Sequence, residues 1–115
     1  MLLISRARSP EAGCWSLPGG KVGVYERTEE AARRETAEEI GISVSGLEPL
    51  CVVEYVVRDE GVHWVSPIFV AEAFDGEPAL LEPDKHTGFG WFSLDGLPSP
   101  LAQSAAEAAK VLKTR

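Results

Sequence analysis

One segment constrains this chain more than any other: residues 20–42, which read GKVGVYERTEEAARRETAEEIGI. Within it, residues 28–40 are rich in alanine, glutamate and arginine and contain no glycine or proline, a composition typical of an α-helix. Gly41 is expected to end this helix in the C-terminal cap position, and Thr28 is the expected N-cap. The sequence therefore predicts a helix with an unusual concentration of negative charge.

Three glutamates of this helix, Glu35, Glu38 and Glu39, are spaced so that they share one face. At about 100° per residue they fall within an arc of roughly 100°. Like charges at this spacing repel each other by a few tenths of a kcal/mol per pair, and neighbouring arginines relieve part of that repulsion. A solvated acidic face is one interpretation. A site for a hard divalent cation is the other, because Mg²⁺ prefers carboxylate oxygens. Spacing alone leaves both interpretations open.

Outside this helix the chain alternates between short apolar runs and turn signals. The turn signals include Pro18-Gly19-Gly20 and Asp59-Glu60-Gly61, and the second joins two runs as in a hairpin. A last helix is expected to open at Ser99-Pro100, with Ser99 as its N-cap. The expected strands are residues 2–4, 14–17, 50–58, 63–74 and 89–94. Together these elements predict one mixed α/β domain over residues 1–115.

Charge and composition exclude several classes of function. The net charge of −7 disfavours binding to a nucleic-acid backbone, whereas a small phosphate compound could bind if a cation reversed the local charge. No apolar run is long enough to cross a bilayer, and the first residues do not resemble a signal peptide. Cys14 and Cys51 are expected to be reduced thiols. These observations predict a cytoplasmic protein that has no membrane partner.

The longer spacing pattern is more specific than the charge. It resembles the signature of the Nudix (MutT-like) hydrolase family, G-x5-E-x7-R-E-U-x-E-E-x-G-U, in which U is apolar. Thr36 occupies one of the two apolar positions, and the preceding run WSLPGG is also similar to the family pattern. The resemblance covers most of the chain and implies an α/β/α sandwich with a mixed β-sheet. The matching fixed positions are Gly20, Glu26, Arg34, Glu35, Glu38, Glu39 and Gly41.

The resemblance implies an enzyme that uses Mg²⁺ or Mn²⁺ to hydrolyse a nucleoside diphosphate linked to another group. The branch it resembles most hydrolyses (deoxy)nucleoside triphosphates, oxidised or dCTP-like ones among them, to a monophosphate and pyrophosphate. One alternative is a pyrophosphatase for ADP-ribose or nucleotide sugars. A further alternative is a domain that senses a nucleotide without cleaving it.

The resemblance also implies roles for individual residues. The implied metal ligands are the carbonyl of Gly20 and the side chains of Glu26, Glu35, Glu38 and Glu39. Glu26 is also implied to pack toward Arg34 and so to orient the helix. The implied catalytic residues are Glu35, Glu38, Arg34 and, as a further ligand or general base on a later loop, Glu82. Arg6 and Lys21 are expected to meet phosphate, and Trp91 is expected to stack on a base. By contrast, Trp15 and Trp64 are expected in the core, and His63 and His86 are expected to be solvated or hydrogen-bonded.

The beginning of the chain departs from the family pattern. Residues 2–6, LLISR, are similar to a strand that usually follows an earlier one, so about one strand is expected to be missing from the sheet. An unpaired sheet edge favours pairing with another chain, which predicts a homodimer.

Overall fold

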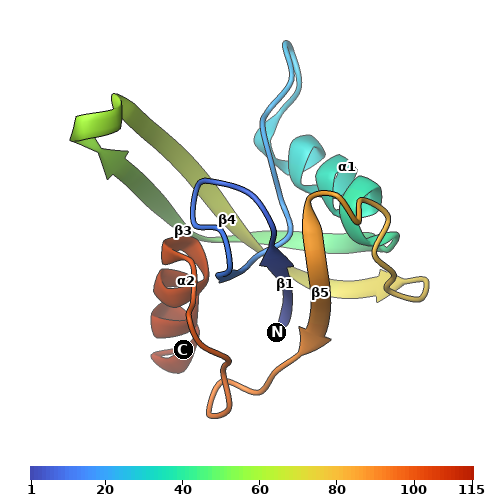
Figure 1. The fold of residues 1–115 in the computed structure, drawn as a ribbon. Helices are drawn as coiled ribbons and strands as arrows, with labels where there is room; N and C mark the ends of the chain where they lie inside the picture. Colours follow the sequence, from blue (N-terminus) through green and yellow to red (C-terminus); the bar gives the residue numbers. More distant parts are fainter.

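The computed structural model describes all residues from Met1 to Arg115 and has an α/β architecture, as the sequence predicts (Figure 1). In chain order the elements are β1 (Leu2–Arg6), β2 (Trp15–Ser16), α1 (Thr28–Ile40), β3 (Ser43–Val57), the 3-10 turn η1 (Arg58–Glu60), β4 (Val62–Asp75), β5 (His86–Trp91) and α2 (Gln103–Lys113). One sheet has the strand order β2-β1-β5, and a second sheet consists of β3 and β4. All of these strand pairs are antiparallel.

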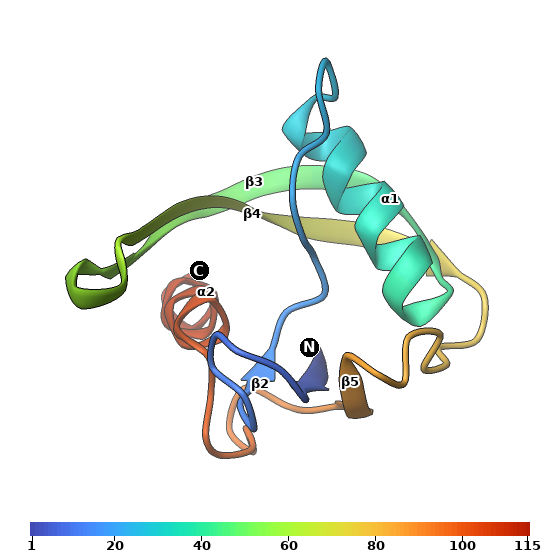
Figure 2. The same cartoon turned by 45° about the horizontal axis from the view of Figure 1, so that its top comes forward.

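β3 and β4 form a long hairpin, and both helices pack against it. Gly61 closes its turn in the left-handed region at φ 66°, which confirms the predicted turn signal. Both views of the fold place α1 beside the half of the hairpin where β3 begins and α2 beside the half that carries the turn (Figures 1 and 2). The Gln103 side chain, at the start of α2, donates a hydrogen bond to the carbonyl of Glu54. Neither helix has the length and apolar character that crossing a membrane requires.

The core that fixes α1 is a small cluster of isoleucines. Ile4 on β1, Ile40 at the end of α1 and Ile42 just after it are all less than 5% exposed and pack together. Burying one such side chain stabilises the fold by about 1.5–3 kcal/mol. Because Ile40 directly follows Glu39, this cluster also sets how the acidic face of α1 lies against β1 and β5.

The bounds of α1 agree with the prediction, and so does its end. Gly41 adopts φ 77°, and its N–H donates to the carbonyl of Ala37. The predicted N-cap is wrong, however. Arg27 occupies that position without a side-chain cap, and Thr28 is already helical.

The predicted start of α2 is also wrong, because the helix begins at Gln103 rather than at Ser99-Pro100. Residues 100–102 join the first sheet instead. Trp15 donates to the carbonyl of Pro100, Ala102 donates to the carbonyl of Trp15, and an isolated parallel bridge connects Trp15 to Leu101. These bonds hold the segment extended up to the first turn of α2.

Two strand boundaries differ from the prediction for a similar reason. β3 begins at Ser43 instead of residue 50, because its first residues pair with the end of β4, as in Ser43 with Asp75. β5 spans 86–91 instead of 89–94, because β1 sets its register from His86, opposite Arg6, to Trp91, opposite Leu2. Long-range pairing decides both boundaries.

Candidate functional site

The three clustered glutamates of α1 enter different environments. The Glu39 side chain is only 8% exposed, that of Glu35 is 18% exposed, and that of Glu38 is 52% exposed. The backbone N–H of Gly19 donates to Glu39 Oε1 at 2.6 Å, and His86 Nε2 lies 3.3 Å from Glu39 Oε2. A purely solvated acidic face does not bury a carboxylate, so that interpretation does not hold for Glu39.

Burial has a clear electrostatic effect on Glu39. The pKa of its carboxyl group is raised to about 7, mainly by loss of solvent and also by the nearby charges of Glu35 and Glu82. The Gly19 hydrogen bond and Arg6 act in the opposite direction. Burial also lowers the pKa of His86 from its usual value, which favours the neutral imidazole. Glu39 and His86 therefore place a carboxylate oxygen and a neutral ring nitrogen side by side. The imidazole carries no full positive charge that would balance the carboxylate.

Glu82 completes a group that could hold a metal ion. One ligand atom each from Glu39, Glu82 and His86 lies within 4.8 Å of the others. His86 is 3% exposed and its Nδ1 has no hydrogen-bond partner, so the expectation that it could be solvated is wrong. Its place at the first residue of β5, opposite Arg6, brings it inward. In the sequence, only the short spacing between Glu82 and His86 could have suggested that these two residues act together.

Arg34 organises the more exposed part of the acidic face. It donates to both oxygens of Glu26 at 2.7 and 2.9 Å, to Glu35 at 2.9 Å and to Glu38 at 3.2 Å. Its remaining contact is with the carbonyl of Lys21 at 2.8 Å. The predicted packing of Glu26 toward Arg34 is thus present in the structure.

The hydrogen bonds from Arg34 have a strong effect on ionisation. They lower the pKa of Glu26 to about 2, with a smaller contribution from the N–H of Gly23. The same contact with Glu26, followed by that with Glu35, raises the pKa of the Arg34 guanidinium. Glu26 and Arg34 therefore form a permanently charged pair beside the helix.

Gly20 brings backbone directly against this face. A Cβ atom at residue 20 would collide with the carboxylate of Glu35, so no larger residue fits without displacing Glu35. This close approach places the loop backbone beside the Glu35 carboxylate. Carboxylate and carbonyl oxygens with one imidazole are a donor set that suits a divalent cation.

A polar cavity of about 200 Å³ adjoins Glu39. It has no hydrophobic lining residue and is formed by Arg6, Arg8, Ser9, Glu39, Lys85 and His86. Arg8 pairs with Asp84 at 2.9 Å, and Lys85 pairs with Glu82 at 3.1 Å. Exposed ion pairs of this kind contribute little to the stability of the fold, so these side chains can exchange partners. The cavity thus sets positive side chains beside the possible metal ligands.

Not every residue singled out in the sequence reaches this cavity. Arg6 lies in its wall, but Lys21 is exposed on the loop that contacts Arg34 through its carbonyl. Trp91 lies at the other end of β5 from His86, about 16 Å away at the usual rise of a strand, and packs on Phe74. The structure therefore does not bring Lys21 and Trp91 together with the Glu39 group.

Comparison with known proteins decides the family. Residues 1–114 match the NUDIX domain. The chain belongs to the Nudix family. Its fold superposes on that of a MutT NUDIX hydrolase from Burkholderia pseudomallei with a TM-score of 0.94 and 50% identity, covering 96% of this Nudix chain and 86% of the other.

Two curated relatives are similar over much of this Nudix domain. An ADP-ribose pyrophosphatase of Methanocaldococcus jannaschii is 37% identical over 85% of the chain and 57% of its own length. An oxidized purine nucleoside triphosphate hydrolase of Danio rerio is 37% identical over 85% of the chain and 61% of its own length. The chain thus spans about three fifths of the length of these relatives.

Proposed function

We propose that this Nudix domain hydrolyses (deoxy)nucleoside triphosphates to a monophosphate and pyrophosphate in a reaction that requires Mg²⁺ or Mn²⁺. The observation that carries the proposal is the buried Glu39 carboxylate, which lies beside Glu82 and His86 in the wall of a cavity that also presents Arg6, Arg8 and Lys85. The Glu39 carboxylate, which has no full positive charge beside it, favours a cation, and guanidinium and ammonium groups favour phosphate oxygens.

Each part of the site has a proposed task. Glu35, Glu38 and Glu39 would hold the metal with the carbonyl of Gly20, and Glu82 would serve as a further ligand or as the base. When bound, the cation would neutralise phosphate charge and lower the pKa of a coordinated water.

The remaining groups position the substrate and the carboxylates. Arg6, Arg8 and Lys85 would bind the phosphate chain and fix its orientation, which is a large part of catalysis in phosphoryl transfer. Arg34 would hold Glu26, Glu35 and Glu38 in place through the hydrogen bonds described above.

Charge favours a triphosphate over a diphosphate ester. Arg6, Arg8 and Lys85 together suit the more highly charged compound, and the Danio rerio relative bears the name of a triphosphate hydrolase. Hydrolysis of ADP-ribose is the second candidate, because the Methanocaldococcus jannaschii relative is named for it. A domain that only senses nucleotides is disfavoured, because every fixed glutamate of the Nudix signature is present.

A direct test is to incubate the purified protein with Mg²⁺ and each of dCTP, dGTP, 8-oxo-dGTP and ADP-ribose and to separate the products by ion-exchange chromatography. We expect monophosphate and pyrophosphate in equal amounts from at least one triphosphate and no turnover when EDTA is present. Turnover of ADP-ribose without turnover of any triphosphate would establish the second candidate instead.

A matched pair of variants on α1 tests the metal assignment. Glu38→Gln should lower turnover by several orders of magnitude, because it removes a charged ligand while keeping the shape of the side chain. Glu30→Gln makes the same change at an exposed position outside the cluster and should leave turnover within about twofold, as is usual for surface substitutions. Wild-type turnover in Glu38→Gln would show that the assignment is wrong.

A further inference from the structure

His86 is a buried residue that contacts both acidic segments of the site. Its Nε2 lies 3.3 Å from Oε2 of Glu39, on α1, and its side chain is only 4% exposed. Its backbone N–H donates to the carbonyl of Glu82 at 3.1 Å. Because its side chain contacts α1 and its backbone contacts the loop before β5, His86 is placed to fix the two carboxylates relative to each other.

The two ring nitrogens of His86 have different surroundings. Nδ1 is buried without a hydrogen-bond partner in the protein, whereas Nε2 faces the Glu39 carboxylate. A proton on Nδ1 would be a buried donor without an acceptor, and the lone pair of Nε2 would then point at a negative charge. A proton on Nε2 can instead be donated to Glu39. The surroundings therefore favour the tautomer that carries its proton on Nε2.

This tautomer disfavours His86 as a metal ligand. A histidine binds a metal through the lone pair of a ring nitrogen, and a nitrogen that carries a proton has none to offer. Metal binding through Nε2 would move the proton to Nδ1, where no group of the protein accepts it. Histidines that bind metals almost always donate their other N–H to a partner. His86 therefore lies among the metal ligands without the surroundings of a ligand.

We propose that His86 is a positioning residue that acts through Glu39, and that the metal is bound by oxygen atoms alone. In this arrangement Nε2–H donates to Glu39 Oε2, and the backbone N–H of Gly19 donates to Oε1 at 2.6 Å. Each carboxylate oxygen keeps a lone pair for the metal. The 3.3 Å contact is long for a hydrogen bond, and such contacts commonly tighten in the loaded enzyme. The catalytic part of this inference rests on the proposed function.

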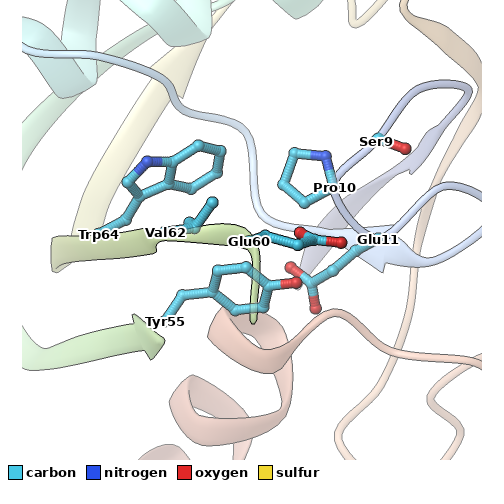
Figure 3. A pocket seen from close by; sticks show the side chains of 7 residues that line it. All are labelled: Ser9, Pro10, Glu11, Tyr55, Glu60, Val62 and Trp64. Atoms are coloured by element: carbon cyan, nitrogen blue, oxygen red, sulfur yellow. The ribbon is translucent and has the colours of Figure 1, made fainter. Parts of the chain in front are cut away.

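The only other histidine, His63, is a matched control. Its side chain is 59% exposed near the hairpin turn, and its Nε2 lies 3.2 Å from Glu54 Oε2. Its neighbour Trp64 is 46% exposed and lines a separate cavity beside Tyr55 (Figure 3), so the expectation that Trp64 belongs to the core is wrong. His63 thus has the same kind of partner as His86, but in solvent and outside the polar cavity.

The first experiment reads the tautomer in the metal-free protein. Long-range proton–nitrogen correlation NMR on isotope-labelled histidine, in EDTA at pH 8, distinguishes a protonated from an unprotonated ring nitrogen. His63→Gln leaves His86 as the single signal. We expect a proton on Nε2 and none on Nδ1, both before and after Mg²⁺ is added. A proton on Nδ1, or a mixture of both tautomers at His86, would overturn the inference.

The second experiment asks which atoms bind the metal. Pulsed EPR of the protein loaded with Mn²⁺ detects the coupling between the ion and a directly bound nitrogen. We expect no such coupling, because oxygen ligands alone suit Mg²⁺ and Mn²⁺. A nitrogen coupling that is present in the wild type and lost in His86→Gln would show that His86 is a ligand.

Two variants test whether the hydrogen bond matters. Because of its side-chain length, His86→Gln places an amide N–H near the position of Nε2, whereas His86→Asn places it near that of Nδ1. His86→Asn should lower kcat and the affinity for Mn²⁺ about 10- to 100-fold, and His86→Gln should keep both within about threefold. Both variants remove the buried ring, so a merely structural role would lower both alike. Equal losses, or no loss in either variant, would overturn the positioning role.

The proposed function fails in a different way. If no triphosphate is hydrolysed, the tautomer of His86 and the Mn²⁺ affinities of the two variants still decide this inference, because neither needs turnover. If thermal denaturation shows that His86→Asn does not fold, the NMR and EPR spectra decide it. A proton on Nε2 and no nitrogen coupling would support it, and the opposite result in either spectrum would overturn it.

Discussion

Glu26 and Glu39 belong to the same signature but lie in opposite environments. Glu26 meets the guanidinium of Arg34, which holds its pKa at about 2, whereas Glu39 is buried beside a neutral imidazole and its pKa rises to about 7. One carboxylate already has its cation in the folded chain, and the other has none. The comparison indicates that Glu26 and Arg34 keep the site in shape, while Glu39 marks where a metal ion would bind.

The strongest way to break this comparison is to remove the charge of Glu39. Glu39→Gln should lower turnover at least about 100-fold, since even residues that only support metal ligands commonly contribute 10–100-fold. The same variant should raise the melting temperature of the metal-free protein, because a buried charge without a cation is lost. Steady-state kinetics and thermal denaturation in EDTA measure the two effects. If Glu39→Gln had lower stability in EDTA and unchanged turnover, the proposed difference between Glu26 and Glu39 would be wrong.

A substitution of Arg34 tests the other side of the comparison. Arg34→Lys keeps the positive charge but cannot reach Glu26, Glu35 and Glu38 together, because an ammonium group lacks the planar fork. We expect turnover to fall roughly 10- to 100-fold through misplacement of the carboxylates. Arg33→Lys is the matched control, because Arg33 contacts only the exposed Glu29. An equal loss in both variants would indicate a general effect on the helix.

The smallest expected effect is a pH dependence of stability that involves Glu39 and not Glu26. The carboxyl group of Glu39 has a folded pKa of about 7 against an ordinary value of 4.5, so folding takes up a proton. This contribution to stability is present at low pH and is lost as the pH rises from 4.5 through about 7. A metal ion must displace that proton, so Mg²⁺ should raise the melting temperature by several degrees more at pH 8 than at pH 5.5.

Thermal denaturation with Mg²⁺ or EDTA at both pH values measures this difference. Glu39→Gln should remove most of it, and Glu26→Gln should not, because Glu26 stays ionised throughout this range. A Mg²⁺ effect that is equal at pH 5.5 and pH 8 in the wild type would contradict the assignment of Glu39 as the protonated ligand.

Much of the site could be predicted because its signals are local. The composition of residues 28–40 and the stop at Gly41 define α1, and the resemblance to the Nudix signature implies the contact between Glu26 and Arg34 that the structure shows. The bounds of β3 could not be predicted in the same way. Its first half contains Gly46 and Pro49, which disfavour a strand locally, and pairing with β4 overrides that preference.

The positions of His86 beside Glu39 and of Trp64 beside a cavity also could not be predicted from the local sequence. His86 lies beside Glu39 because β1 fixes the register of β5, and Trp64 becomes part of a cavity because the hairpin turn meets residues 9–11. Both depend on contacts between distant segments. The sequence marks the kind of residue, and only the fold shows which surface it faces.

The loop around Ser9 has a consequence for how new activities could arise. Hydrogen bonds at both ends hold it, from Ala7 to the carbonyl of Lys85 and from Gly13 to the carbonyl of Arg6. Its Ser9 lines both the polar cavity and the cavity that residues 9–11 form with Tyr55, Glu60, Val62 and Trp64. The loop nevertheless precedes α1 in the chain and contains none of the signature residues. Libraries that vary residues 9–12 would therefore explore the range of compounds accepted while the hydrolytic apparatus stays intact, which makes this short loop the natural starting point for redesign.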